Sequence, residues 1–155
     1  MLYDPASMSS RSVTSEWPPD VDAFAARFAE CTIPREEWTH LAHLIVGLWH
    51  LHRFGPEEAL RQLRVGIRRL NESHGTLNTA TGGYHETITR AYVALLSDFD
   101  RSCPAEMSLG ARVTQLLNSQ LAERDVLLKF FSRERLMSPH ARADWVEPDI
   151  APLRL

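Results

Sequence analysis

The sequence has few of the features that mark a disulfide-rich, membrane-spanning or secreted protein. Only two of its 155 residues are cysteines, and Cys31 and Cys103 lie far apart, which favours reduced thiols over a disulfide framework. No apolar run reaches the ~18 residues that a membrane span requires. The Ser-rich residues 1–17 lack the apolar core of a signal peptide. We therefore expect a cytoplasmic protein without a membrane partner.

Several functional motifs are also absent, and the charge is nearly balanced. The formal net charge is -3, and Lys129 is the only lysine, so electrostatics give no reason to expect a nucleic-acid partner. Neither the GxxxxGK[ST] nor the GxGxxG pattern occurs, which disfavours nucleotide binding. The GxSxG turn of the serine hydrolases is missing as well. With 44% hydrophobic and 24% charged residues, the composition is that of an ordinary globular domain.

Strand-like alternation is missing, whereas apolar residues recur at helical spacing, so we predict an all-α fold. The expected domain is a single helical bundle over residues 20–155, preceded by a flexible N-terminal arm over residues 1–19 that ends in a Pro-Pro pair. About five main helices are expected from the periodicity. Their predicted ranges are residues 20–30, 34–54, 56–70 and 84–99, with further helical segments at 105–118 and 119–131. Residues 146–155 should form an extended tail that packs on the bundle.

The second predicted helix contains the most informative stretch of the chain. Between Thr39 and His52 no side chain is formally charged, yet four histidines occur: His40, His43, His50 and His52. At roughly 100° per residue, a continuous helix would gather five positions within an arc of about 80°. These positions are Glu36, His40, His43, Gly47 and His50. Since imidazole is seldom buried without a partner, the pattern predicts a polar site in a buried helix.

The spacing His40-x-x-His43 presents two imidazoles to one point on a helix face. His85 is the predicted third ligand, because two glycines precede it and a helix begins there. Three histidines from two helices would leave positions open for water or substrate, as in a catalytic divalent-metal site. Zn, Fe and Mn all suit such ligands. Glu36 is a further candidate ligand, although an acid in the first turn of a helix is also an ordinary dipole partner.

Two glutamates are candidates for catalysis. Glu86 or Glu37 could act as general base beside a mononuclear metal ion, which would support hydrolysis or transfer on a small polar substrate. Glu86 could equally form a surface ion pair with Arg90, four residues later. Glu37-x-x-His40 matches the repeated element of di-iron bundles, but no second copy occurs. Whether the protein is an enzyme is left open.

The Asn-, Thr- and Gly-rich loop over residues 71–84 supplies candidate substrate-binding residues: His74, Asn78, Thr79 and Tyr84. Long ordered connections are often functional, but Asx and Thr turns could equally serve to structure the loop itself. The alternative function is a metal-free module in which the histidines and this loop bind a small molecule or an anion. A third alternative is an interaction protein with purely structural histidines, and a homodimer is kept open.

Three segments together resemble a family of small bacterial proteins to which we attach no activity. They are EWTHLAHL at 37–44, NTATGGYHET at 78–87 and WVEPD at 145–149, and the similarity extends over roughly residues 24–153. The resemblance implies that these segments belong together in an all-α protein. A looser similarity of architecture exists to the DinB/YfiT-like bundles, which hold one divalent ion with three histidines. Their His-x-x-x-His spacing is not found here, so their activities are not carried over.

Overall fold

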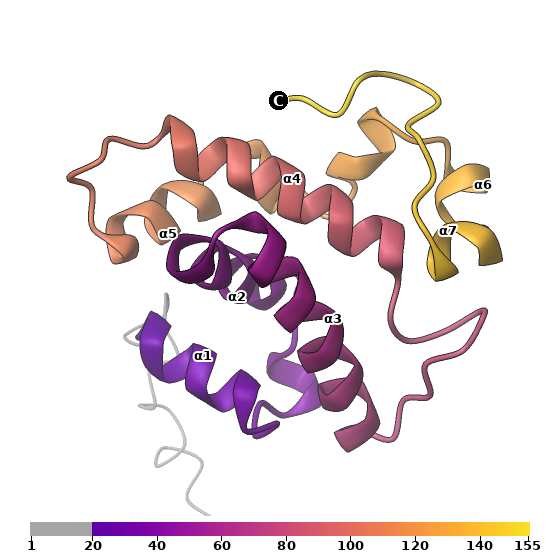
Figure 1. The fold of residues 1–155 in the computed structure, drawn as a ribbon, viewed down its shortest axis with the longest axis horizontal. Coiled ribbons are helices and arrows are strands. Elements are labelled where there is room, and N and C mark those ends of the chain that lie inside the picture. The colour runs from indigo at the N-terminus through magenta and orange to yellow at the C-terminus, as the bar shows by residue number, and fades with distance from the viewer. Residues whose placement is uncertain (1–19) are drawn as a thin grey trace, which may run out of the picture.

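Three long helices meet at the centre of the protein: α2 (His40–Phe54), α3 (Pro56–Ser73) and α4 (Glu86–Ser102). The computed structural model describes residues 20–155, and all regular structure within that range is helical (Figure 1). Helix α1 (Val21–Ala29) packs on α2 and α3. The all-α prediction is therefore confirmed, while the predicted N-terminal arm lies outside the described residues.

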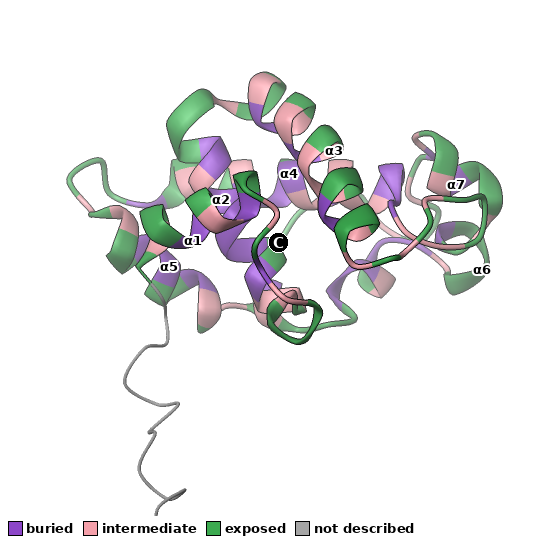
Figure 2. Ribbon diagram, turned by 90° about the horizontal axis from the view of Figure 1, so that it is seen from below, coloured by how far each residue is buried: buried purple, intermediate pink, exposed green. Residues whose placement is uncertain are grey.

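Helices α2 and α3 form the predicted hairpin. Gly55 ends α2 with a φ of 78°, a backbone conformation that favours glycine, and Pro56 occupies the first turn of α3. Buried residues follow α2 along most of its length, whereas α3 is largely intermediate or exposed and contributes only Ala59, Leu63 and Leu70 to the buried set (Figure 2). No helix within residues 20–155 is long and apolar enough to cross a membrane.

The second helix begins later than the sequence pattern predicted. Residues Arg35–Glu37 form a separate 3₁₀ turn, η2, and the backbone leaves helical geometry at Trp38. Thr39 then caps α2, because its Oγ1 accepts a hydrogen bond from the backbone N–H of Ala42 at 3.3 Å. Glu36 and Glu37 therefore precede the helix, and the predicted arc that combined Glu36 with His40 does not exist.

The predicted helix over residues 119–131 is also wrong. Two short 3₁₀ turns occupy this region, η3 (Gln120–Ala122) and η4 (Val126–Lys129). An extended backbone at Glu123, with φ -68° and ψ 128°, separates them. They follow α5 (Leu109–Leu117), which is shorter than the range 105–118 that we predicted.

The C-terminal segment follows two one-turn helices, α6 (Arg133–Leu136) and α7 (Pro139–Ala143), and packs on the bundle as predicted. The Ile150 N–H donates to the carbonyl oxygen of Phe130 at 2.9 Å. The Asp149 carboxylate accepts from the N–H and hydroxyl of Ser132, at 2.7 and 2.6 Å. Asp149 therefore fastens the tail at the start of α6.

The connection from α3 to α4 is held by the side chain of Asn78. Its amide group donates to the carbonyl oxygen of Arg68 at 3.2 Å, and its carbonyl oxygen accepts from the backbone N–H of Tyr84 at 3.0 Å. Gly83 lies between these anchors with a φ of 74°. A Cβ at this position would stand 2.6 Å from the carbonyl oxygen of Leu77. Only glycine fits there without strain.

We expect Gly83→Ala to lower the free energy of unfolding by about 1–3 kcal/mol, because it combines a strained φ with a steric clash. Gly82→Ala is the matched control, since a Cβ at Gly82 would meet its nearest neighbour at an ordinary 3.7 Å. Urea denaturation of both variants gives the comparison. Equal stability of the two variants would contradict this assignment.

Candidate functional site

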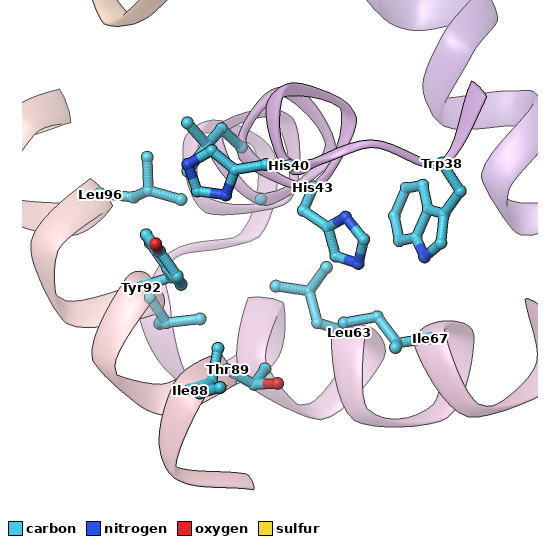
Figure 3. A pocket seen from close by; sticks show the side chains of 12 residues that line it. Trp38, His40, His43, Leu63, Ile67, Ile88, Thr89, Tyr92 and Leu96 are labelled. Atoms are coloured by element: carbon cyan, nitrogen blue, oxygen red, sulfur yellow. The ribbon is translucent and has the colours of Figure 1, made fainter. Parts of the chain in front are cut away.

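A cavity of about 230 Å³ lies between α2, α3 and α4 (Figure 3). Its wall is mostly aliphatic and aromatic, and within residues 20–155 no Asp, Glu, Lys or Arg lines it. The lining residues from η2 to α2 are Trp38, His40, His43, Leu44 and Gly47; those from α3 and α4 are Leu63, Ile67, Ile88, Thr89, Tyr92, Val93 and Leu96. Two of the predicted site residues, His40 and His43, therefore face one cavity.

His43 has a fixed tautomer. Its Nδ1 lies 2.7 Å from the carbonyl oxygen of Thr39, and because a carbonyl oxygen only accepts, Nδ1 must carry the proton. The ring stacks against Trp38 with 3.8 Å between centroids. The ring is exposed along the partly open cavity, and Trp38 covers one of its faces.

Burial lowers the pKa of His43 to about 4, against the opposing effect of the Thr39 hydrogen bond, and nearby His40 lowers it further. His43 is therefore neutral at pH 7, with an unprotonated Nε2. This nitrogen makes no hydrogen bond to any residue of the described range 20–155, and it points toward the α3 side of the cavity (Figure 3). Nε2 is thus a free hydrogen-bond acceptor.

His40 is held in the opposite tautomer. Its Nε2 lies 3.0 Å from the carbonyl oxygen of Leu121 and donates to it. In the neutral ring, Nδ1 is then an acceptor. The Tyr92 ring approaches from α4 at 5.5 Å between centroids, on the same side of the cavity (Figure 3). Burial, and to a smaller extent the charge of Asp125, raises the pKa of Tyr92 to about 12, so its hydroxyl stays protonated.

His85 does not join this pair, which corrects the predicted three-histidine ligand set. His85 is the N-cap of α4: its Nδ1 accepts from the backbone N–H of Ile88 at 3.2 Å, and its Nε2 donates to the carbonyl oxygen of Leu136 at 2.7 Å. Both nitrogens are occupied, so neither offers a lone pair to a metal. Throughout residues 20–155, no three His, Cys, Asp or Glu side chains are placed to hold a metal ion. The residues do not fit the predicted centre, and a divalent ion at His40 and His43 alone stays a prediction.

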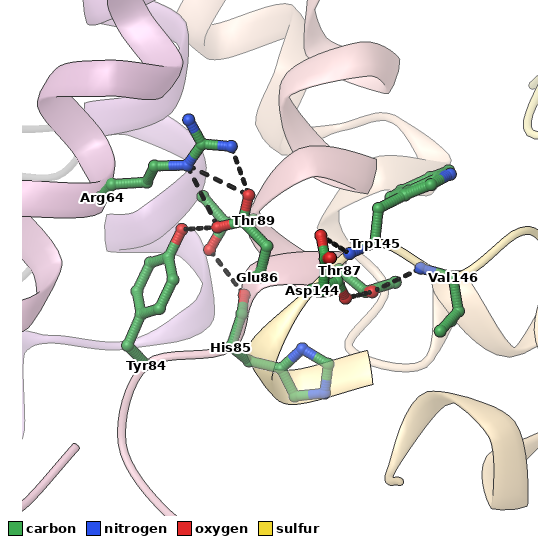
Figure 4. Close-up of polar contacts among 9 residues, drawn as sticks. All are labelled: Arg64, Tyr84, His85, Glu86, Thr87, Thr89, Asp144, Trp145 and Val146. Carbon is green, nitrogen blue, oxygen red and sulfur yellow. Dashed lines mark hydrogen bonds and ion pairs between the residues drawn. The ribbon is translucent and has the colours of Figure 1, made fainter. Parts of the chain in front are cut away.

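The predicted catalytic carboxylates also lie away from the cavity. Glu86 is buried in an ion pair with Arg64, and it accepts from the Tyr84 hydroxyl at 2.7 Å (Figure 4). Burial acts to raise the pKa of Glu86, but the hydrogen bonds from Arg64 and Tyr84 prevail and lower it. Glu37 pairs with Arg27 at 2.9 Å, and Glu36 is exposed in η2. None of the three lines the cavity.

The loop residues predicted to bind substrate hold the loop together instead. His74 places Nε2 2.7 Å from the carbonyl oxygen of Ile33, and its own carbonyl accepts from Arg35. The Thr79 hydroxyl accepts from the N–H of Gly82 at 3.1 Å. Asn78 and Tyr84 make the internal contacts described above. The loop is therefore a structural element. The predicted contribution of its residues to a substrate-binding site is not observed.

The other two histidines of α2 have separate surroundings. His50 is buried and donates from Nδ1 to the carbonyl oxygen of Val46 at 2.8 Å. His52 is exposed, with its Nδ1 3.5 Å from the Asp100 carboxylate. Neither lines the cavity.

Sequence reasoning missed the α4 wall of the cavity. Ile88, Thr89, Tyr92 and Leu96 lie at spacings of three and four residues, but none of them was predicted as a site residue. The polar residues Thr89 and Tyr92 at this spacing could have indicated a wall with hydrogen-bonding groups. Only the packing of α4 on α2 shows which histidines they face.

Comparison of the chain with family models, with curated proteins and with solved structures gave no match. The resemblance noted from the sequence motifs therefore stays a prediction, and function is argued from the site.

The tautomers can be tested by long-range ¹H–¹⁵N NMR of the histidine rings. We expect the Nδ1–H tautomer for His43, the Nε2–H tautomer for His85, and a His43 ring that remains neutral down to about pH 4. A His43 ring that titrates near the ordinary histidine pKa of about 6.5 would contradict the assignment.

Three histidines also predict how stability depends on pH. Burial lowers the pKa values of His43, His50 and His85 in the folded protein. Since the unfolded chain takes up protons near pH 6.5, their contribution is complete above that pH and decreases as the pH falls toward the folded values. We expect a lower urea midpoint at pH 5.5 than at pH 7.5.

The matched variant for this prediction is His85→Asn, which retains an N-capping side chain without a titrating ring. Its urea midpoint should change less between the two pH values than that of the wild type. A wild-type midpoint that is constant or rises on acidification would refute the prediction.

Proposed function

We propose that the protein is a binding protein that holds a small, uncharged organic molecule in the cavity between α2, α3 and α4, in direct contact with His40 and His43. One observation carries this proposal. The cavity combines an apolar wall with two imidazole rings whose neutral tautomers are set by backbone carbonyls. Apolar pockets with a few oriented polar groups are typical of small-molecule sites, and helical bundles place them between helices.

The size of the cavity limits the ligand. An engineered cavity of about 150 Å³ admits benzene. At about 230 Å³, this cavity accommodates one substituted ring or a molecule of similar bulk.

Charge limits the ligand further. A bound anion would need a cation or several converging N–H groups, and no Asp, Glu, Lys or Arg side chain of residues 20–155 lines the cavity. His43 does not supply the charge, because it is neutral at pH 7. The lining of the cavity therefore favours a small uncharged molecule over an anion as the ligand of the predicted metal-free binding module.

Unpaired polar atoms in the cavity wall also support a ligand. The indole Nε1 of Trp38 is buried and has no hydrogen-bond partner within residues 20–155. Nε2 of His43, whose ring stacks on this indole, is unpaired as well. Buried polar groups in native proteins are nearly always paired, so the unpaired indole N–H of Trp38 indicates a place for a hydrogen-bond partner, such as a bound molecule or water, at the cavity wall.

Toluene tests the cavity directly. Saturating toluene should raise the melting temperature of the wild type, since a ligand that binds only the native state stabilises it. Ile88→Phe fills the cavity and should abolish this rise, whereas Ile150→Phe is the matched control on the exposed tail. No stabilisation of the wild type, or equal stabilisation of Ile88→Phe, would overturn the proposed function.

A further inference from the structure

We infer that the ligand of this cavity is an aromatic ring bearing a hydroxyl group, that is, a neutral phenol. The inference rests on the proposed function and specifies the chemistry of the molecule bound. It follows from the polar atoms that face the cavity and from the rings in its wall.

His43 presents a hydrogen-bond acceptor to the cavity. Its Nδ1 is committed to the carbonyl oxygen of Thr39, so Nε2 faces the cavity as an acceptor. A ligand group that meets Nε2 must therefore donate a hydrogen bond. A ligand with acceptors alone would leave this nitrogen desolvated and unpaired, which costs free energy.

His40 and Tyr92 add a second acceptor and a donor to the cavity wall. Nδ1 of His40 is also an acceptor in the neutral ring, because Nε2 donates to Leu121. The Tyr92 hydroxyl remains protonated and makes no hydrogen bond within residues 20–155, so it can donate to the ligand. A hydroxyl group both donates and accepts, and it is the smallest group that suits an imidazole acceptor and a phenol donor together.

The aromatic side chains of the cavity wall favour a ligand with an aromatic ring. Aromatic side chains form two sides of the cavity, with Trp38 and His43 on one and His40 and Tyr92 on the other (Figure 3). Aliphatic side chains of α3 and α4 close the space between them. Aromatic rings prefer offset-stacked and edge-to-face neighbours, so this wall favours a planar ring over a saturated one.

The experiment compares phenol with toluene, two ligands of nearly equal size in which a hydroxyl replaces a methyl group. Dissociation constants come from ¹H–¹⁵N NMR titrations of the wild type at pH 7. Apolar transfer favours toluene, so tighter binding of phenol requires a hydrogen bond in the cavity. We expect phenol to bind about three- to tenfold more tightly than toluene, the range that a net hydrogen bond gives.

The variants locate the hydrogen bond. His43→Phe keeps a ring against Trp38 and removes the acceptor, and His40→Phe does the same for the second imidazole. At least one of them should lose the preference for phenol while it still binds toluene. His52→Phe is the matched control, because His52 is exposed on the same helix and does not line the cavity. It should keep the wild-type ratio.

The outcomes separate the inference from the proposed function. If toluene binds and phenol binds no more tightly, the inference fails and the proposed function stands. If cyclohexanol binds as tightly as phenol, the requirement for an aromatic ring fails; if benzoate does, the requirement for a neutral ligand fails. If neither toluene nor phenol binds the wild type, both proposals fail. The ligand comparison uses the wild type, so it does not depend on whether the variants fold.

Discussion

The hydrogen bond from Nδ1 of His43 to the carbonyl oxygen of Thr39 determines what the central cavity can bind. Thr39 acts twice, because its hydroxyl caps α2 while its carbonyl oxygen orients the imidazole one turn later. The start of the helix and the tautomer of the ring are therefore set by the same residue. Burial keeps the ring neutral, since its pKa is about 4, and its remaining nitrogen is left as an acceptor within an apolar wall.

The hydrogen bonds of His85 differ from those of the two cavity histidines. His40 and His43 each bond one ring nitrogen to a carbonyl oxygen, and the other nitrogen has no partner within residues 20–155. His85 uses both nitrogens, one for the Leu136 carbonyl oxygen and one for the backbone N–H of Ile88 in the first turn of α4. The distinction arises because an N-cap side chain faces the N–H groups of its own helix, where no ligand fits between. A glycine pair before a helical histidine therefore indicated a cap and not a metal ligand.

The sequence allowed the all-α fold, the hairpin at Gly55-Pro56 and the packed tail to be predicted, because each depends on local periodicity or on the preferences of glycine and proline. It also indicated His40 and His43 as neighbours. The break in the predicted helix at Trp38 was missed, because the only sequence signal for a helix start at this point is the capping side chain of Thr39. The α4 wall could not be assigned from one sequence, because it depends on which face of α4 packs against α2. Most of the candidate site is thus a product of tertiary packing.

The most direct test of the account is a crystal of the protein soaked with 4-bromophenol, in which the anomalous signal of bromine locates the ligand independently of any activity. We predict one strong bromine peak in the cavity between α2, α3 and α4, with the phenol oxygen within hydrogen-bonding distance of His43 Nε2 or His40 Nδ1. An empty cavity in a crystal that binds the ligand elsewhere, or a ring whose oxygen points away from both imidazoles, would contradict the account.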